Sequence, residues 1–424
     1  MKSCKLLLPV ILFLLFGCFR KERNVVFSAG GAPNEIEFWE TILKDFEKES
    51  GIQVSILRQP TDSDLRRQSI LVPLKAGKED PDVFLMDIAW ISQFASADWL
   101  EDLAPAVEKD KFDLSVLWPN ILDFADRFNG KLAALPVYVD AGLLYYRADL
   151  LKKYGFKSPP GTWEELVSYS IKIQNDVRKT KPDFFGFVWQ GSQYEGLICN
   201  FLEFAGSNNG GLKINDSGIK INTKENLEAL KFMTDLIHKT KISPPNTFTE
   251  MKEEEVRMFF QQGNALFERN WPYAWGLHSQ EGSPVKGRVG IAPLPRFKKG
   301  KSVSTLGGWH IAISKYSDRK EDAWKFVKFI VSKETQKLLS MKLGWNPSRM
   351  DVYKDKNVLS VHPHFAELGK IFTNAMPRPN LPYYTQVSEL MQKSINAVIS
   401  GKKEPEEALA GLEKDIEKLS ARYK

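Results

Sequence analysis

Large aromatic side chains stand beside glycine and proline at several places in the chain. Residues 270–275 (NWPYAW) hold three rings around one proline, and residues 306–310 (LGGWH) place a Trp directly after two glycines. Residues 136–140 (PVYVD) offer a phenol and a carboxylate two positions apart, on one face of a strand, and residues 377–379 (PRP) fix one Arg between prolines. Flat rings can cover the C–H face of a pyranose, while ionised Asp, Glu and Arg bind its hydroxyls. The pattern predicts a carbohydrate site; the alternative is an aromatic-rich core.

Familiar catalytic motifs are absent from the sequence. It contains no Gly-x-Ser-x-Gly, no Walker loop, no Gly-x-Gly-x-x-Gly and no His-Glu-x-x-His. The five histidines form no convincing metal set, so we expect neither a metal nor a cofactor. Carboxylates are plentiful, and a secreted glycoside hydrolase acting on α-glucosides stays open as the alternative, with Glu35, Asp87 and Asp140 as candidate acids.

Strands and helices must position these side chains. Buried runs alternate with helical spacing near the N-terminus, which predicts strands at 25–29, 52–57 and 82–86 and helices at 35–50 and 64–75. This β-α-β-α-β order indicates a parallel, doubly wound sheet, whose ligands lie beyond the carboxyl ends of its strands. Asp87 and the glycine turn at 30–31 are at those ends.

The same mixture continues to the C-terminus. Further strands are expected at 131–139, 142–146, 185–189, 289–294 and 309–314, and helices at 162–175, 225–239, 247–263, 318–343, 384–400 and 405–423.

The first eighteen residues predict export. Two lysines precede an apolar run at 6–16, which is the layout of a signal peptide and too short for a comfortable membrane span. Residues 15–18 (LFGC) resemble a bacterial lipobox, although Phe16 is bulkier than usual, so residues 1–17 are expected to leave and Cys18 to be lipidated. A plain signal peptide and an uncleaved anchor are the alternatives. Cys199 is then alone, and no intramolecular disulfide is expected.

Length and charge narrow the class of protein. With 424 residues, 43% hydrophobic residues and 26% charged residues, the chain can bury a large core, and intrinsic disorder is excluded as its main state. Loss of residues 1–17 removes two lysines and no acids, so the net charge falls from +6 to +4. A net charge this small gives no reason to expect a nucleic-acid partner.

The chain resembles the family 1 extracellular solute-binding proteins of ABC sugar importers, and looks most like the trehalose/maltose-binding members. The resemblance covers nearly all of the expected mature chain. The stretches that carry it are residues 30–37 (GGAPNEIE), 80–87 (DPDVFLMD), 135–138 (LPVY), 140–147 (DAGLLYYR), 267–275 (FERNWPYAW), 305–310 (TLGGWH) and 377–379 (PRP).

The resemblance implies an α/β fold of the type II periplasmic-binding-protein kind, with two lobes, each a doubly wound sheet flanked by helices, and a ligand cleft between them. The first lobe would span 24–139 and 304–345, and the second 140–303 and 346–424. The stretch 208–220 departs from the relatives, and no ligand role is carried into it.

The family's sugar contacts fall on matching positions of this sequence. They are Glu35, Arg66 (with Arg67 adjacent), Asp87, Tyr138, Asp140, Trp271, Tyr273, Gly307, Gly308, Trp309 and Arg378. The resemblance implies a monomeric, lipid-anchored receptor at the cell surface or in the periplasm. It would capture trehalose or maltose by hinge closure and hand the sugar to the permease subunits of an ABC importer.

Overall fold

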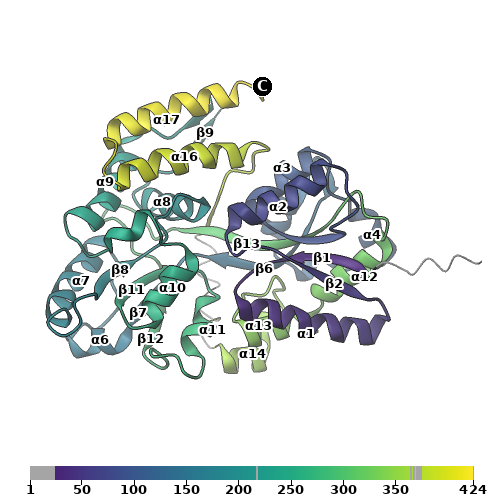
Figure 1. Ribbon diagram of the computed structural model, residues 1–424, viewed down its shortest axis with the longest axis horizontal. Coiled ribbons are helices and arrows are strands. Elements are labelled where there is room, and N and C mark those ends of the chain that lie inside the picture. The colour runs from purple at the N-terminus through teal and green to yellow at the C-terminus, as the bar shows by residue number, and fades with distance from the viewer. Residues whose placement is uncertain (1–23, 216–217, 363–364, 366–367, 369–374, 424) are drawn as a thin grey trace, which may run out of the picture.

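The computed structural model describes residues 24–215, 218–362, 365, 368 and 375–423. Two α/β lobes lie side by side, and β6 and β13 run between them (Figure 1). The predicted signal peptide and Cys18 lie outside the described residues. Among the helices that the structure describes, none is long and apolar enough to cross a membrane.

The first lobe is built on a sheet in the order β2-β1-β3-β13, with β6 and β14 also paired to β13. β1, β2 and β3 run parallel, and β13 is antiparallel to β3 and to β6. Alternate residues of β3 and β13 enter separate cores on the two faces of the sheet. The strands are β1 (Val25–Ala29), β2 (Val54–Arg58), β3 (Val83–Asp87), β6 (Leu135–Ala141), β13 (Ser304–Ile313) and β14 (Ala375–Pro377).

Helices cover both faces of this sheet. Helix α1 shows why they form: its buried positions Trp39, Leu43 and Phe46 recur at helical spacing, and Gly51 ends it with a φ of 72°. The helices of this lobe are α1 (Pro33–Ser50), α2 (Ser63–Lys75), α3 (Ile91–Ser96), α4 (Ala104–Lys109), α5 (Pro119–Ile121), α12 (Lys320–Ile330) and α13 (Lys333–Leu343).

The second lobe has a mixed sheet in the order β12-β7-β11-β8. Its strands are β7 (Leu143–Arg147), β8 (Phe185–Val188), β11 (Ala265–Asn270) and β12 (Val289–Ala292). Its helices are α6 (Ala148–Lys153), α7 (Trp163–Val177), α8 (Glu195–Ser207), α9 (Lys224–His238), α10 (Glu253–Gln261), α11 (Ala274–Ser279), α16 (Tyr384–Ile399) and α17 (Pro405–Ser420). Thr162 caps α7 by accepting a hydrogen bond from the Glu165 amide, as its sequence predicts.

Short elements complete the description. They are β4 (Arg127–Phe128), β5 (Lys131–Leu132), β9 (Lys213–Asn215), β10 (Gly218–Lys220), α14 (Lys356–Val361) and the single turns η1 (Ile88–Trp90), η2 (Leu114–Val116), η3 (Leu122–Asp126), η4 (Pro245–Phe248) and η5 (Val352–Lys354).

The α/β fold with two lobes is confirmed, but two predicted helices are wrong. The helix expected at 318–343 is divided into α12 and α13, because the Ser332 side chain caps a new helix start by accepting from the Thr335 amide. The helix expected from 247 begins only at Glu253. Thr247 is buried, and its hydroxyl donates 2.6 Å to the Pro244 carbonyl instead of capping.

The lobes are joined at β6 and β13. Ala141 ends β6 in the first sheet, and after Gly142 the chain enters β7 of the second. β13 pairs with β3 through its last five residues, and its first three pair with β14. Lobe boundaries at 139/140, 303/304 and 345/346 remain a prediction.

Candidate functional site

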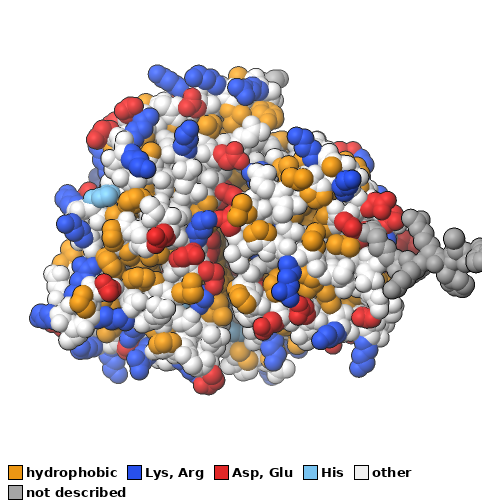
Figure 2. Space-filling view, in the orientation of Figure 1, with side chains coloured by type: hydrophobic (Ala, Val, Ile, Leu, Met, Phe, Trp, Pro, Cys, Tyr) orange, Lys and Arg blue, Asp and Glu red, His pale blue; other side chains and the backbone are white. Residues whose placement is uncertain are grey.

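A cavity of about 820 Å³, including its opening to solvent, lies between the two lobes. Acidic side chains gather along the line between the lobes (Figure 2). The structure brings all eleven of the predicted site residues to the cavity wall: Glu35, Arg66, Asp87, Tyr138, Asp140, Trp271, Tyr273, Gly307, Gly308, Trp309 and Arg378.

The first lobe presents its polar groups at the carboxyl ends of its parallel strands. Glu35 is in the first turn of α1, which follows β1, and Arg66 is in the first turn of α2, which follows β2. Asp87 is the last residue of β3, where its Oδ1 accepts 2.8 Å from the Ala89 amide. Arg67 points elsewhere and pairs with Glu389 outside the cavity. The helical register therefore places Arg66, and not its neighbour, in the cavity wall.

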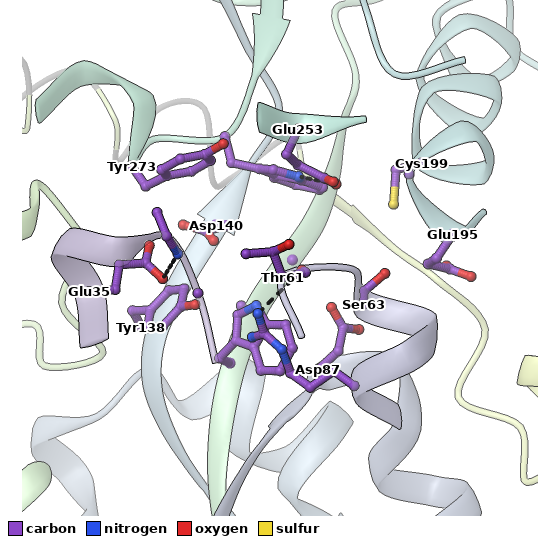
Figure 3. A pocket seen from close by; sticks show the side chains of 18 of the residues that line it. Glu35, Thr61, Ser63, Asp87, Tyr138, Asp140, Glu195, Cys199, Glu253 and Tyr273 are labelled. Carbon is purple, nitrogen blue, oxygen red and sulfur yellow. Dashed lines mark hydrogen bonds between the residues drawn. The ribbon is translucent and has the colours of Figure 1, made fainter. Parts of the chain in front are cut away.

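Two carboxyl groups of the cavity wall are almost fully shielded from solvent. Glu35 is 8% exposed and accepts 3.1 Å from the Ala32 amide; burial raises its pKa to about 7, although Arg66 opposes the shift. Asp140 on β6 is 7% exposed, and burial, with Glu35 and Asp87 nearby, raises its pKa to about 8. Both groups lie at the left and centre of Figure 3. Such carboxyls can accept or donate hydrogen bonds with sugar hydroxyls.

Arg378 joins carboxylates from both lobes. It follows β14, is 4% exposed, and pairs with Asp87 of the first lobe at 2.8 Å and with Glu195 of α8 at 3.1 Å. Glu195 also accepts 2.8 Å from the Tyr384 hydroxyl, and a short hydrogen bond from Ser388. The guanidinium and its two carboxylates therefore form one end wall of the cavity.

Two tryptophans on opposite lobes are each backed by an arginine. The Arg66 guanidinium lies 4.1 Å from the ring centroid of Trp309, and that of Arg269 lies 4.0 Å from the ring of Trp271. The Arg269 guanidinium is in turn fixed by Glu203, to whose carboxylate it donates two hydrogen bonds of 2.5 and 2.8 Å. Each ring is thus held in a fixed orientation, as a stacking surface for a sugar requires.

Phenols and a third indole complete the wall. The Tyr138 ring is 4.0 Å from the ring of Trp345, centroid to centroid, at an interplanar angle of 33°. The Tyr273 hydroxyl donates 2.7 Å to Glu254. Burial, aided by Glu254, holds the pKa of Tyr273 well above its usual value, so this phenol stays a hydrogen-bond donor.

The two glycines before Trp309 allow close approach of the crossing strands. Gly308 has a φ of +135°, and a Cβ there would lie 2.5 Å from the Tyr138 carbonyl oxygen. A Cβ at Gly307 would meet the Trp271 ring at 3.0 Å. Any side chain at 308 would therefore push β13 away from β6, where Tyr138 and Asp140 are carried.

Sequence reasoning missed several residues of the same wall: Thr61, Ser63, Glu195, Gly196, Cys199, Glu253, Glu254 and Trp345. The pair Glu253–Glu254 opens α10, where carboxylates are ordinary helix-start residues, so the sequence carries no signal for a site. Cys199 is buried and free, and burial raises its thiol pKa. Among the described residues, no group of three or more His, Cys, Asp or Glu could hold a metal ion.

Comparison with known proteins gives consistent matches. The model of the family described as bacterial extracellular solute-binding protein matches residues 32–337. A probable ABC transporter-binding protein from Deinococcus radiodurans is 37% identical over 379 residues, which is 88% of each chain.

Two solved structures extend the comparison to three dimensions. The maltose-bound MalE3 of T. maritima is 39% identical with a TM-score of 0.87, covering 93% of this chain and 99% of that one. A solute-binding protein of an ABC transporter from Thermotoga lettingae, bound with α-D-tagatose, is 28% identical with a TM-score of 0.83, covering 94% and 99%.

Proposed function

Because the chain belongs to the bacterial extracellular solute-binding protein family, we propose that it captures an α-glucoside disaccharide, trehalose or maltose, for an ABC importer. Proteins of this family bind sugars and deliver them to a membrane permease. They are not enzymes, which excludes the glycoside hydrolase alternative. The choice of disaccharide rests on the resemblance of the sequence to trehalose/maltose-binding proteins, to which the side chains of the cavity wall add support.

One observation carries the proposal: the cavity combines fixed aromatic faces with hydrogen-bonding groups supplied by both lobes. Trp309 comes from the first lobe and Trp271 from the second, and Glu35 and Asp140 add carboxyls to the same cavity wall. Rings on opposite walls suit a ligand with more than one apolar sugar face. The maltose complex of the 39% identical T. maritima protein supports the same ligand class.

Capture by hinge motion follows from the way the lobes are joined. A sugar that touches both lobes binds the closed arrangement more tightly than the open one, and it therefore shifts the population toward closure. β6 and β13 cross between the lobes beside the cavity, where Gly307 pairs with Asp140 and Gly308 with Val139. We propose bending at these strands during closure, with the lobe boundaries as predicted from the sequence.

Lipid anchoring completes the proposed function. The signal-like segment 1–17 and Cys18 support a lipoprotein held at the cell membrane, from which a short charged linker leads into the first lobe. Radioactive palmitate supplied to the growing cells should label the unmodified protein and not the Cys18→Ala variant, as followed by immunoprecipitation and autoradiography. Equal labelling of the two proteins, or labelling of neither, would contradict lipidation of Cys18.

Binding should weaken when either a ring or a cavity carboxylate is removed. We expect Trp309→Ala and Asp87→Ala each to reduce the binding free energy by roughly 1–3 kcal/mol, since each removes one buried contact. Isothermal titration calorimetry with trehalose and maltose measures the loss. Asp183→Ala, at an exposed turn of the second lobe, is the control and should bind as the unmodified protein does. Equal binding by both site variants would refute the site, and a wild type that binds neither sugar would refute the ligand.

A further inference from the structure

Charged side chains join the two lobes at a place separate from the cavity wall. Asp62, which caps the start of α2 in the first lobe, forms an ion pair with Lys252, which precedes α10 in the second. Arg67 of α2 pairs with Glu389 of α16 at 2.7 Å. None of these four residues, which we call the clasp, lines the cavity.

The first ion pair of the clasp is held from both sides. Asp62 Oδ1 accepts 2.9 Å from the Leu65 amide, which orients the carboxylate, and its other oxygen meets Lys252. The Lys252 ammonium also lies 5.3 Å from the centroid of the Tyr194 ring in its own lobe. Although burial would raise the pKa of Asp62, the hydrogen bond from Lys252 holds it below its usual value, so this carboxylate is ionised at neutral pH.

The second ion pair lies on the neighbouring turn of α2. The Arg67 side chain is only 6% exposed, whereas Glu389 is 57% exposed. Beside it, the Gln392 side chain of α16 donates a hydrogen bond of 3.3 Å to the Asp64 carboxyl group, which adds another contact between the same two helices. Helix α2 therefore presents Arg66 to the cavity and Asp64 and Arg67 to the other lobe.

We propose that the clasp stabilises the closed arrangement of the lobes and thereby sets the affinity for every ligand by a common factor, without touching the sugar. The inference rests on the proposed sugar-receptor function. Apparent affinity is the intrinsic affinity scaled by the fraction of molecules in the binding-competent state. Contacts that exist only between closed lobes change that fraction, and they leave discrimination between sugars unchanged.

The test compares the double variant Lys252→Met/Glu389→Gln with the unmodified protein. We expect Kd for trehalose and for maltose to rise by the same factor, roughly 5- to 100-fold, in calorimetry. Lys252→Arg keeps the ion pair and should keep Kd near the wild-type value. Because exposed charges are screened, the wild-type Kd should also rise more steeply with salt than that of the double variant.

A matched control removes the same two charge types within one lobe. Lys231 of α9 and Glu406 of α17 form an exposed ion pair in the second lobe, and Lys231→Met/Glu406→Gln should leave Kd unchanged. An unchanged Kd in the clasp variant, or a change confined to one sugar, would overturn the proposal.

A second measurement separates the clasp from the identity of the ligand. We propose that the clasp keeps a large part of the sugar-free population closed. In small-angle X-ray scattering without sugar, the clasp variant should therefore show a larger radius of gyration than the wild type and the control. Equal values overturn the clasp. A wild type that binds neither disaccharide overturns the proposed ligand instead, and scattering then decides on the clasp alone.

Discussion

Replacement of Arg378 with Met is expected to lower the free energy of unfolding by about 3–5 kcal/mol, because it leaves two carboxylates without their cation. Asp87 and Glu195 both pair with this guanidinium, which is 4% exposed. The loss should appear in chemical denaturation at pH 7, and sugar binding should fall with it because the end wall of the cavity is broken.

Two further variants show whether unpaired charge is the cause. Arg378→Lys keeps a cation but cannot form both contacts as the planar guanidinium does, so its loss should be smaller than that of Arg378→Met. Adding Glu195→Gln to Arg378→Met removes one of the two stranded charges and should recover part of the stability. A loss below about 1 kcal/mol for Arg378→Met, or no recovery in the double variant, would contradict the role of the ion pairs.

Much of the first lobe could be predicted from the sequence because its segments carry strong local patterns. Val25–Ala29 is an apolar run, broken only by Ser28, between a charged segment and a glycine turn, and the structure gives a strand with these bounds. In the same way, the spacing of the apolar residues in α1 predicts that helix, and Gly51 predicts its C-terminal end. Asp87 follows from this pattern, since the end of a parallel strand is a position for ligand groups.

Aromatic rings beside glycine and proline marked the stretches that carry Tyr138, Asp140, Trp271, Tyr273, Trp309 and Arg378 as candidates, whereas Glu35 and Arg66 as sugar contacts depended on the resemblance. Nothing in the residues around Arg378 indicates that it spans Asp87 and Glu195, which are 291 and 183 positions away in the sequence. The helix that carries Glu195 was missed because α8 is buried on every side, so its few polar residues, such as Asn200 and Glu203, contact other buried groups and do not form a charged, solvent-facing stripe. The same limit applies to the clasp, since Asp62 and Lys252 are ordinary cap and surface residues until the lobes are seen together.

The break between α12 and α13 has a different origin. Apolar spacing continues through 318–343, and Ser332 alone marks the end of one helix and the start of the next. A single serine in a helical pattern is equally compatible with an exposed helical position. Tertiary packing decides: the Gln336 amide donates 3.2 Å to the Ile330 carbonyl across the break, and its oxygen accepts 2.9 Å from Ser348.

Replacement of Asp140 with Asn is expected to make the sugar-free protein more stable at alkaline pH, by an amount on the order of a few kcal/mol. The pKa of Asp140 rises from 3.8 to about 8 on folding, chiefly through burial. The folded protein therefore binds more protons than the unfolded chain between these values, and stability falls as pH increases from about 4 to 8. Asn cannot ionise, so Asp140→Asn lacks the part of this pH-dependent decrease that Asp140 causes. The free energies of unfolding of the two proteins should differ least near pH 4 and most above pH 8.

Guanidinium denaturation at a series of pH values measures the effect of Asp140. Asp45→Asn, at an exposed position of α1, is the matched control, and its curve should follow that of the wild type. Parallel curves for Asp140→Asn and the wild type would contradict the assignment of a buried, neutral carboxyl. Burial of the Asp140 carboxyl group lowers the stability of the folded protein, but it keeps this group available to a hydroxyl of the ligand. The Asp140→Asn variant should therefore gain stability and lose affinity for sugar in calorimetry. A gain in both would separate Asp140 from the binding site.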